Sequence, residues 1–180
     1  AIQGGVSVVQ LREKEASSRE LFELAKRVKR VTDKYDVPLI INDRLDICLA
    51  VDAAGVHLGQ ADLPCSEARR ILGAEKIIGV SAATPEEAAK AQSDGADYLG
   101  VGAVFATSTK TNTRPVTAET IRAIRSVVDI PFVVIGGVNS ENISGLHGLG
   151  INGAAVISAI ISQPDITAAA RKMRQAAERL

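Results

Sequence analysis

The sequence predicts an α/β protein with a (β/α)₈ barrel of the TIM type. Short apolar runs typical of β-strands alternate with helical segments along the 180 residues. The runs 38–41 and 131–135 are apolar at consecutive positions, which favours parallel strands buried on both faces. Polar residues recur where these runs end, and in a barrel such ends meet on the face where catalysis occurs.

Seven apolar runs are candidate strands. They cover residues 6–11, 38–42, 55–58, 76–80, 98–105, 132–135 and 154–157. No GxGxxG motif follows any of them, so the pattern does not support an open dinucleotide-binding sheet.

The helical segments carry recognisable start signals. Ser17 begins a sequence typical of a capping box, and Thr84 precedes a proline at the first helical position. Thr117 and Asn139 can begin two further helices. The last helix is expected over residues 166–180, just after a proline.

Composition narrows the classes of function. Nearly half of the residues are apolar, as expected for a single domain over residues 1–180 with a sizeable core. The formal net charge is zero and no long basic run occurs, which argues against a nucleic-acid partner or an anionic membrane. Cys48 and Cys65 form no CxxC motif, and no signal peptide or membrane-spanning stretch is recognisable, so we expect a cytoplasmic protein. With His57 and His147 as the only histidines, a zinc cluster or a Ser-His-Asp triad has little support.

Charged residues at the strand ends suggest anion and metal binding. Arg12 and Lys14 lie two residues apart, a spacing that places both on one side of a strand, although a solvated charged turn explains them equally well. Asp43 and Asp62 follow successive strands and suit magnesium, which prefers carboxylate oxygens. A turn or a helix cap is the alternative role for each aspartate.

Two later segments are candidates for substrate contact. Residues 107–114 form a polar loop that could cover a substrate or be an ordinary surface loop. Gly136 and Gly137 follow an apolar strand, where backbone N–H groups can approach a phosphate closely. His57, inside an apolar run, is expected to be a hydrogen-bonded strand residue, and His147 to be structural on a helix.

A series of motifs resembles one family in order along the chain. The motifs are VQLREK at 9–14, INDR within 40–44, GVHLGQADLP at 55–64, GVS at 79–81, TSTK at 107–110, GG at 136–137 and VISAI at 156–160. Each is weak alone, but the combination is similar to the thiamine-phosphate synthase family over residues 9–160.

The resemblance implies magnesium-dependent transfer of an aminopyrimidine-methyl group from its diphosphate to a thiazole phosphate, through a dissociative mechanism. It implies small-molecule substrates and leaves the oligomeric state open. A related thiazole tautomerase and a non-catalytic phosphate-binding regulator on the same barrel remain the alternatives.

The resemblance also implies roles for individual residues. Those expected at the pyrimidine diphosphate are Gln10, Leu11, Arg12, Glu13, Lys14, Asn42, Ser81 and Lys110. Among them Arg12, Lys14, Ser81 and Lys110 are the expected catalytic residues. The magnesium ligands are expected to be Asp43 and Asp62. The residues expected at the thiazole phosphate are Thr107, Ser108, Thr109, Gly137, Ile157 and Ser158.

The chain departs from the family pattern at two loops. Ala83 stands where the family usually has a histidine, and Ala103 and Ala106 stand where it often has prolines. These differences affect local loop shape and none of the residues assigned a role.

The resemblance also implies that one strand is missing. The family's first strand and helix precede the two glycines that here are Gly4 and Gly5. We therefore expect Val8 and Val156 to lie on strands that do not pair, roughly 9–10 Å apart, twice the usual strand spacing. An upstream segment, or a segment of another chain, is expected to fill the slot.

Overall fold

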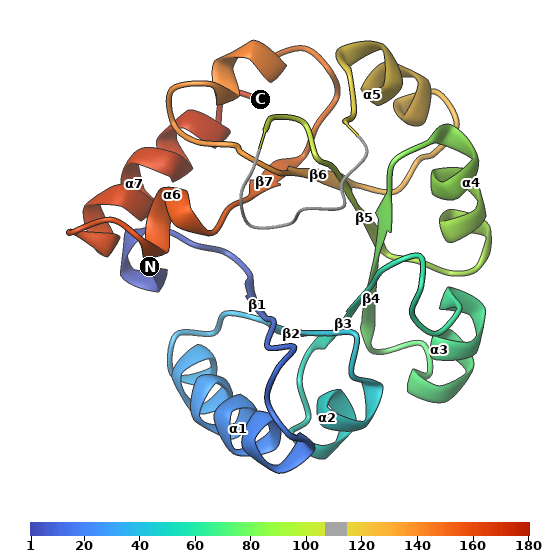
Figure 1. Cartoon of the computed structure of the whole chain (residues 1–180), viewed down its shortest axis with the longest axis vertical. Helices are drawn as coiled ribbons and strands as arrows, with labels where there is room; N and C mark the ends of the chain where they lie inside the picture. The colour runs from blue at the N-terminus through green and yellow to red at the C-terminus, as the bar shows by residue number, and fades with distance from the viewer. Residues whose placement is uncertain (107–114) are drawn as a thin grey trace.

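The computed structural model describes residues 1–106 and 115–180. Seven parallel strands form one curved sheet in the order β1-β2-β3-β4-β5-β6-β7. Their bounds are β1 Val9–Leu11, β2 Leu39–Asn42, β3 Gly55–Leu58, β4 Ile77–Ala82, β5 Tyr98–Gly102, β6 Phe132–Ile135 and β7 Gly153–Ala155. Figure 1 shows the strands curled into a ring with the helices outside it. The expected barrel architecture is confirmed.

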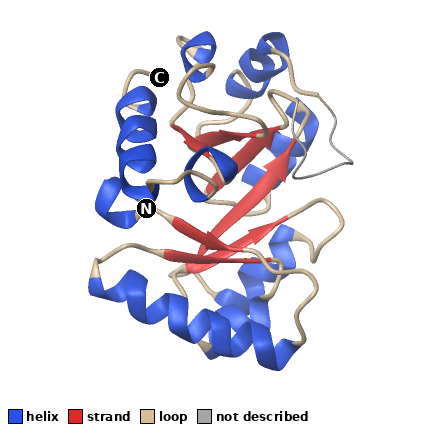
Figure 2. Cartoon of the chain, turned by 60° about the vertical axis from the view of Figure 1, so that its left-hand side comes forward, coloured by secondary structure: helices blue, strands red, loops and turns tan. Residues whose placement is uncertain are grey.

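Helices cover the outer side of the sheet (Figure 2). The α-helices are α1 Ser18–Lys34, α2 Leu45–Ala50, α3 Cys65–Leu72, α4 Pro85–Ser93, α5 Ala118–Arg125, α6 Ser158–Ile161 and α7 Ile166–Ala177. Two 3₁₀ turns, η1 Ile2–Gly4 and η2 Ile143–Leu146, complete the described elements. None of the helices in the described residues is long and apolar enough to cross a membrane.

Most of the expected helix starts are confirmed. The Ser17 backbone N–H donates to the Glu20 carboxylate at 2.9 Å, and the Ser17 hydroxyl accepts from the Glu20 N–H at 3.4 Å, which completes the capping box. Thr84 and Thr117 also cap their helices. Asn139 instead accepts two backbone N–H groups in a tight turn, which leads only into η2, so the α-helix expected there is wrong.

Several expected elements are longer than the observed ones. The strand expected over 6–11 is only β1, and the strands expected over 98–105 and 154–157 end at Gly102 and Ala155. A strand extends only as far as its neighbour pairs with it: β1 meets β2 at three positions, and β7 meets β6 at three. The last helix ends at Ala177 instead of 180, and His147 follows η2 instead of lying on a helix.

The apolar strands are buried on both faces, as predicted. Adjacent residues of a strand point to opposite faces, yet Ile40 and Ile41 are 1% and 0% exposed. Phe132 on β6 is fully buried, and Arg125 of α5 lies 5.3 Å from the centre of its ring. The core therefore occupies the interior of the ring and the layer between sheet and helices.

The ring is open between β1 and β7. These strands are the two edges of the sheet, and none of the backbone hydrogen bonds of the described residues joins them. Val8 and Val156 lie one residue outside β1 and β7, and Figure 1 shows the gap between these two strands. The expectation that the two strands do not pair is confirmed, while their separation of roughly 9–10 Å stays a prediction.

Candidate active site

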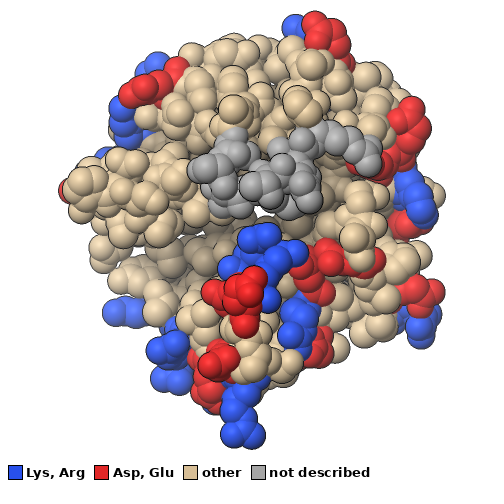
Figure 3. Space-filling view, in the orientation of Figure 1, with Lys and Arg blue, Asp and Glu red and all other residues tan. Residues whose placement is uncertain are grey.

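The site lies at the carboxyl ends of the first four strands. Lys14 comes shortly after β1, Asp43 directly after β2 and Asp62 four residues after β3. Ser81 is the second-last residue of β4. Because the strands are parallel, these ends meet on one face of the ring. In Figure 3 charged side chains of both signs gather near the middle of this face of the ring.

Asp43 has a backbone conformation that turns the chain sharply after β2. Its φ is 62°, in the left-handed region that Asp and Asn tolerate better than most residues. Its N–H donates to the His57 carbonyl on β3 at 2.9 Å, so the neighbouring strand holds this turn. The position of the carboxylate is therefore set by the sheet.

Asp43 and Asp62 bring two carboxyl groups together next to one ammonium group. The Lys14 Nζ lies 3.2 Å from Asp43 Oδ2. Asp62 Oδ2 accepts the Gly59 N–H at 2.6 Å, and the Asp43 and Asp62 carboxyl groups are near enough to shift each other's pKa. The two acids and the lysine therefore form one charged cluster.

The surroundings shift the pKa values of the two acids in opposite directions. Burial opposes ionisation of Asp43, but hydrogen bonds to Asp62 and Lys14 and the nearby positive charges outweigh it, so the pKa of Asp43 is lowered. The pKa of Asp62 is raised, first by burial and then by the neighbouring Asp43 carboxyl group with its negative charge. Two neighbouring carboxyl groups fit a divalent metal that takes two carboxylates and completes its shell with substrate oxygens and water.

No group of three or more His, Cys, Asp or Glu residues that could hold a metal occurs in residues 1–106 and 115–180. An all-protein cage is therefore not present in this part of the chain.

Ser81 belongs to a hydrogen-bonded group inside the ring. Its Oγ lies 3.0 Å from His57 Nε2, and its carbonyl accepts from Gln60 Nε2 at 2.6 Å. His57 Nδ1 lies 2.9 Å from the Tyr98 hydroxyl. His57 is a hydrogen-bonded strand residue, as expected. Sequence reasoning did not find Tyr98 or Gln60, and no local signal marks the tyrosine.

The other residues assigned to the pyrimidine diphosphate differ in their surroundings. Leu11 and Asn42 are partly buried at the ends of β1 and β2. Arg12 is exposed, and its charge helps to lower the pKa of Asp43. Glu13 is exposed and accepts the N–H of Glu15 at 2.9 Å within the loop.

The described residues assigned to the thiazole phosphate follow β6 and β7, on the other side of the ring. Gly137 has φ 66°, and a side chain there would collide with the Ala106 carbonyl oxygen, so only glycine fits. Ile157 is 49% exposed and precedes Ser158, the first residue of α6. Thr107, Ser108, Thr109 and Lys110 lie outside the described residues.

The loop at Ala83, where the family usually has a histidine, is held by a hydrogen bond to the next helix. The Ala83 N–H donates to Glu87 Oε2 at 2.7 Å, and Glu87 lies in the first turn of α4. This bond supports the chain directly after β4 without the histidine usual in the family.

The fold and the site define a (β/α)-barrel with a paired-carboxylate and lysine cluster at its catalytic face. A family model described as thiamine monophosphate synthase matches residues 1–160. The chain therefore belongs to the thiamine monophosphate synthase family.

Individual relatives agree with this assignment. A thiamine-phosphate synthase of Ruminiclostridium cellulolyticum is 58% identical over 173 residues, which are 96% of this chain and 82% of the relative. That of Alkaliphilus oremlandii is 55% identical over 97% of this chain and 83% of its own length. The solved thiamine phosphate pyrophosphorylase of Pyrococcus furiosus superposes with a TM-score of 0.91 at 40% identity, covering 98% of this chain and 85% of that protein.

More distant structures show the fold alone. A 3-hexulose-6-phosphate synthase superposes with a TM-score of 0.71 at 18% identity, over 96% of this chain and 87% of that protein.

Proposed function

We propose that this chain transfers the (4-amino-2-methylpyrimidin-5-yl)methyl group from its diphosphate to a thiazole phosphate, giving thiamine phosphate and pyrophosphate in a magnesium-dependent reaction. The observation that carries this proposal is the cluster of Lys14, Asp43 and Asp62 at the carboxyl ends of the strands, in a chain of this family.

Asp43 and Asp62 would hold the magnesium ion. When bound, the ion supplies positive charge to the oxygens of the departing diphosphate. Arg12 and Lys14 add cationic donors to the same group, and Lys110 is assigned this role from its motif. The remaining pyrimidine contacts are proposed for Gln10, Leu11, Glu13, Asn42 and Ser81.

The thiazole phosphate is proposed to bind on the opposite side of the ring. Gly137, Ile157 and Ser158 would bind it together with Thr107, Ser108 and Thr109. Gly137 makes a left-handed turn shortly after β6, where backbone N–H groups would approach the phosphate.

The bond changes require no nucleophilic side chain. The bond between the pyrimidine methylene carbon and the diphosphate oxygen breaks, and its electron pair leaves with the diphosphate. The lone pair of the thiazole nitrogen then forms the new carbon–nitrogen bond. The protein must hold the nitrogen in line with that carbon and keep water away from the cation.

We further propose that the partners are small molecules and that the protein is cytoplasmic. The balance of 21 basic and 21 acidic residues and the two free buried cysteines support this proposal.

The decisive experiment measures pyrophosphate release from the pyrimidine diphosphate. Release is expected only when thiazole phosphate and magnesium are both present, with thiamine phosphate formed in equal amount. Equal release without the thiazole partner would identify a hydrolase and reject the proposal. Binding of thiazole phosphate without any product in the complete mixture would indicate a tautomerase or a regulator instead.

The paired acids predict how the magnesium requirement depends on pH. Because the pKa of Asp62 is raised, this group keeps its proton to a higher pH than an ordinary aspartate does. Magnesium must displace that proton, so the magnesium concentration giving half-maximal rate should rise as the pH is lowered from about 7 toward about 5. Steady-state titrations at each pH measure this, and an unchanged half-saturation value across the range would contradict it.

A further inference from the structure

A four-residue turn after β3 carries Asp62, one of the two proposed magnesium ligands. The Asp62 N–H donates to the Gly59 carbonyl at 3.2 Å, and the Gly59 N–H donates back to Asp62 Oδ2 at 2.6 Å. A Cβ atom at Gly59 would lie 3.0 Å from the same oxygen. The carboxylate is therefore packed against the backbone of its own turn, and a movement of the turn moves the carboxylate with it.

The turn places the Asp62 carboxylate at the same strand end as Asp43. Asn42 of β2 pairs with His57 of β3, and the Asp43 N–H donates to the His57 carbonyl at 2.9 Å. The Asp62 carboxylate is bound to the N–H of Gly59, which is only two residues further along the chain. Both acids are thus attached to the end of β3, and their separation depends on where the turn lies.

The Gln60 side chain joins this turn to the neighbouring strand. Its Nε2 donates to the Ser81 carbonyl of β4 at 2.6 Å. Gln60 is exposed, so burial does not hold its side chain in place. The hydrogen bond to Ser81 therefore fixes the turn relative to β4.

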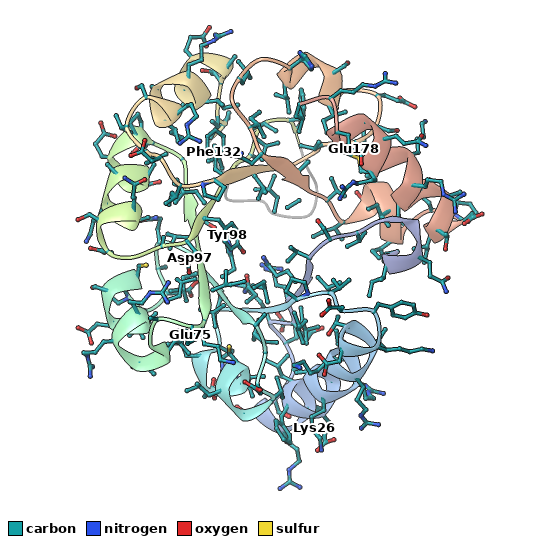
Figure 4. The ribbon with its side chains drawn as sticks, turned by 180° about the vertical axis from the view of Figure 1, so that it is seen from behind. Lys26, Glu75, Asp97, Tyr98, Phe132 and Glu178 are labelled. Carbon is teal, nitrogen blue, oxygen red and sulfur yellow. The ribbon has the colours of Figure 1, made fainter. Side chains whose placement is uncertain are left out.

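β4 is a rigid anchor for the turn. It is the middle one of the seven strands, and it pairs with β3 on one side and β5 on the other. Ser81 Oγ also lies 3.0 Å from His57 Nε2, and His57 Nδ1 lies 2.9 Å from the Tyr98 hydroxyl. Figure 4 shows the Tyr98 side chain pointing into the interior of the ring. Because Ser81 is held from both neighbouring strands, the turn is the part that moves when the Gln60 bond is lost.

We infer that Gln60 is a positioning residue for the metal site: its amide holds the Asp62 turn against β4, and so keeps Asp62 close enough to Asp43 for both carboxylates to bind one divalent cation. The inference rests on the proposed function, which assigns the metal to these two acids. In this role Gln60 acts through Asp62 and contacts neither metal nor substrate. Residues that orient metal ligands in this way are commonly worth about 10–100-fold in metal affinity.

The test uses Mn²⁺ as the probe and follows its binding by the loss of the free-ion signal in electron paramagnetic resonance. Gln60→Met keeps the length of the side chain but has no donor for the Ser81 carbonyl, and should raise the Kd for Mn²⁺ by about tenfold or more. Gln175→Met is the matched control, because Gln175 is an exposed residue of α7, and it should leave the Kd unchanged.

The transfer reaction gives a second readout. Gln60→Met should raise the half-saturating magnesium concentration by a similar factor, while kcat at saturating magnesium stays within a few-fold. The free energy of unfolding in urea should stay within about 0.5 kcal/mol of the wild type, because the side chain is exposed. A general loss of stability would not produce this separation of metal affinity from kcat.

Gln60→Ala repeats the titration with a shorter side chain and decides the matter where Gln60→Met fails to fold. Wild-type Mn²⁺ affinity in the folded Gln60 variants would overturn this inference alone. Wild-type protein that forms no thiamine phosphate would reject the proposed function, and the Mn²⁺ titration would still decide the role of Gln60. Wild-type protein that binds no Mn²⁺ would overturn the metal site and this inference together.

Discussion

Replacement of Asp43 by asparagine is expected to lower turnover by about a hundredfold or more, since even residues that only orient metal ligands are commonly worth about 10–100-fold. The substitution removes one negative charge from the proposed magnesium site and breaks the ion pair with Lys14. Asparagine tolerates the left-handed backbone at this position, so the turn itself should persist. The rate is measured against magnesium concentration, and the half-saturating concentration should rise as well.

Asp46→Asn is the matched control for this experiment. Asp46 lies three residues further on, and its carboxylate pairs with Arg44 at 2.6 Å on the surface. Loss of an exposed pair of this kind costs little, about 0–1 kcal/mol, and should leave turnover within a few-fold. If Asp43→Asn kept the wild-type rate and magnesium dependence, Asp43 would not be part of the site.

Gly55→Ala is expected to destabilise the fold by about 3 kcal/mol or more, at the upper end of the usual cost of overpacking. Gly55 begins β3, in the middle of the sheet, and pairs with both Ile40 and Ile77. A Cβ atom there would overlap the Ile77 carbonyl oxygen, which is backbone and cannot rotate away. The sheet must therefore separate locally between β3 and β4.

Urea unfolding measures this effect as a shift of the midpoint at constant slope. Gly145→Ala provides the control, because an added Cβ atom there meets nothing within 4 Å. Its free energy of unfolding should remain within about 0.5 kcal/mol of the wild type. Equal stability of the two variants would show that β3 and β4 can move apart at Gly55 without cost.

Local sequence determined the alternation of elements and where most of them begin. Consecutive apolar residues such as Ile40 and Ile41 have no exposed face in a strand, so the pattern alone predicts a sheet covered on both sides. Capping is equally local, because the Ser17 side chain bonds to a backbone group only three residues away. The expectation at Asn139 failed because an Asx turn and a helix cap use the same side-chain bond.

Strand lengths depended on distant residues. β1 and β7 are three residues long because each pairs with its neighbour at only three positions, which no local pattern reveals. The opening between them was inferred from the resemblance to the family and is seen in the sheet order.

The sequence by itself determined the family and named the residues at the strand ends, because each motif is contiguous and keeps its residue types. Only the tertiary structure decided which of these side chains meet. The Lys14–Asp43 pair joins residues from different strand ends, and His57 on β3 meets Ser81 and Tyr98 on the next two strands. Hydrogen bonds and charges act over a few ångströms in space, whatever the separation along the chain. The ring brings β3, β4 and β5 within that reach, and so creates the hydrogen-bonded group of His57, Tyr98 and Ser81 that no segment of the sequence contains.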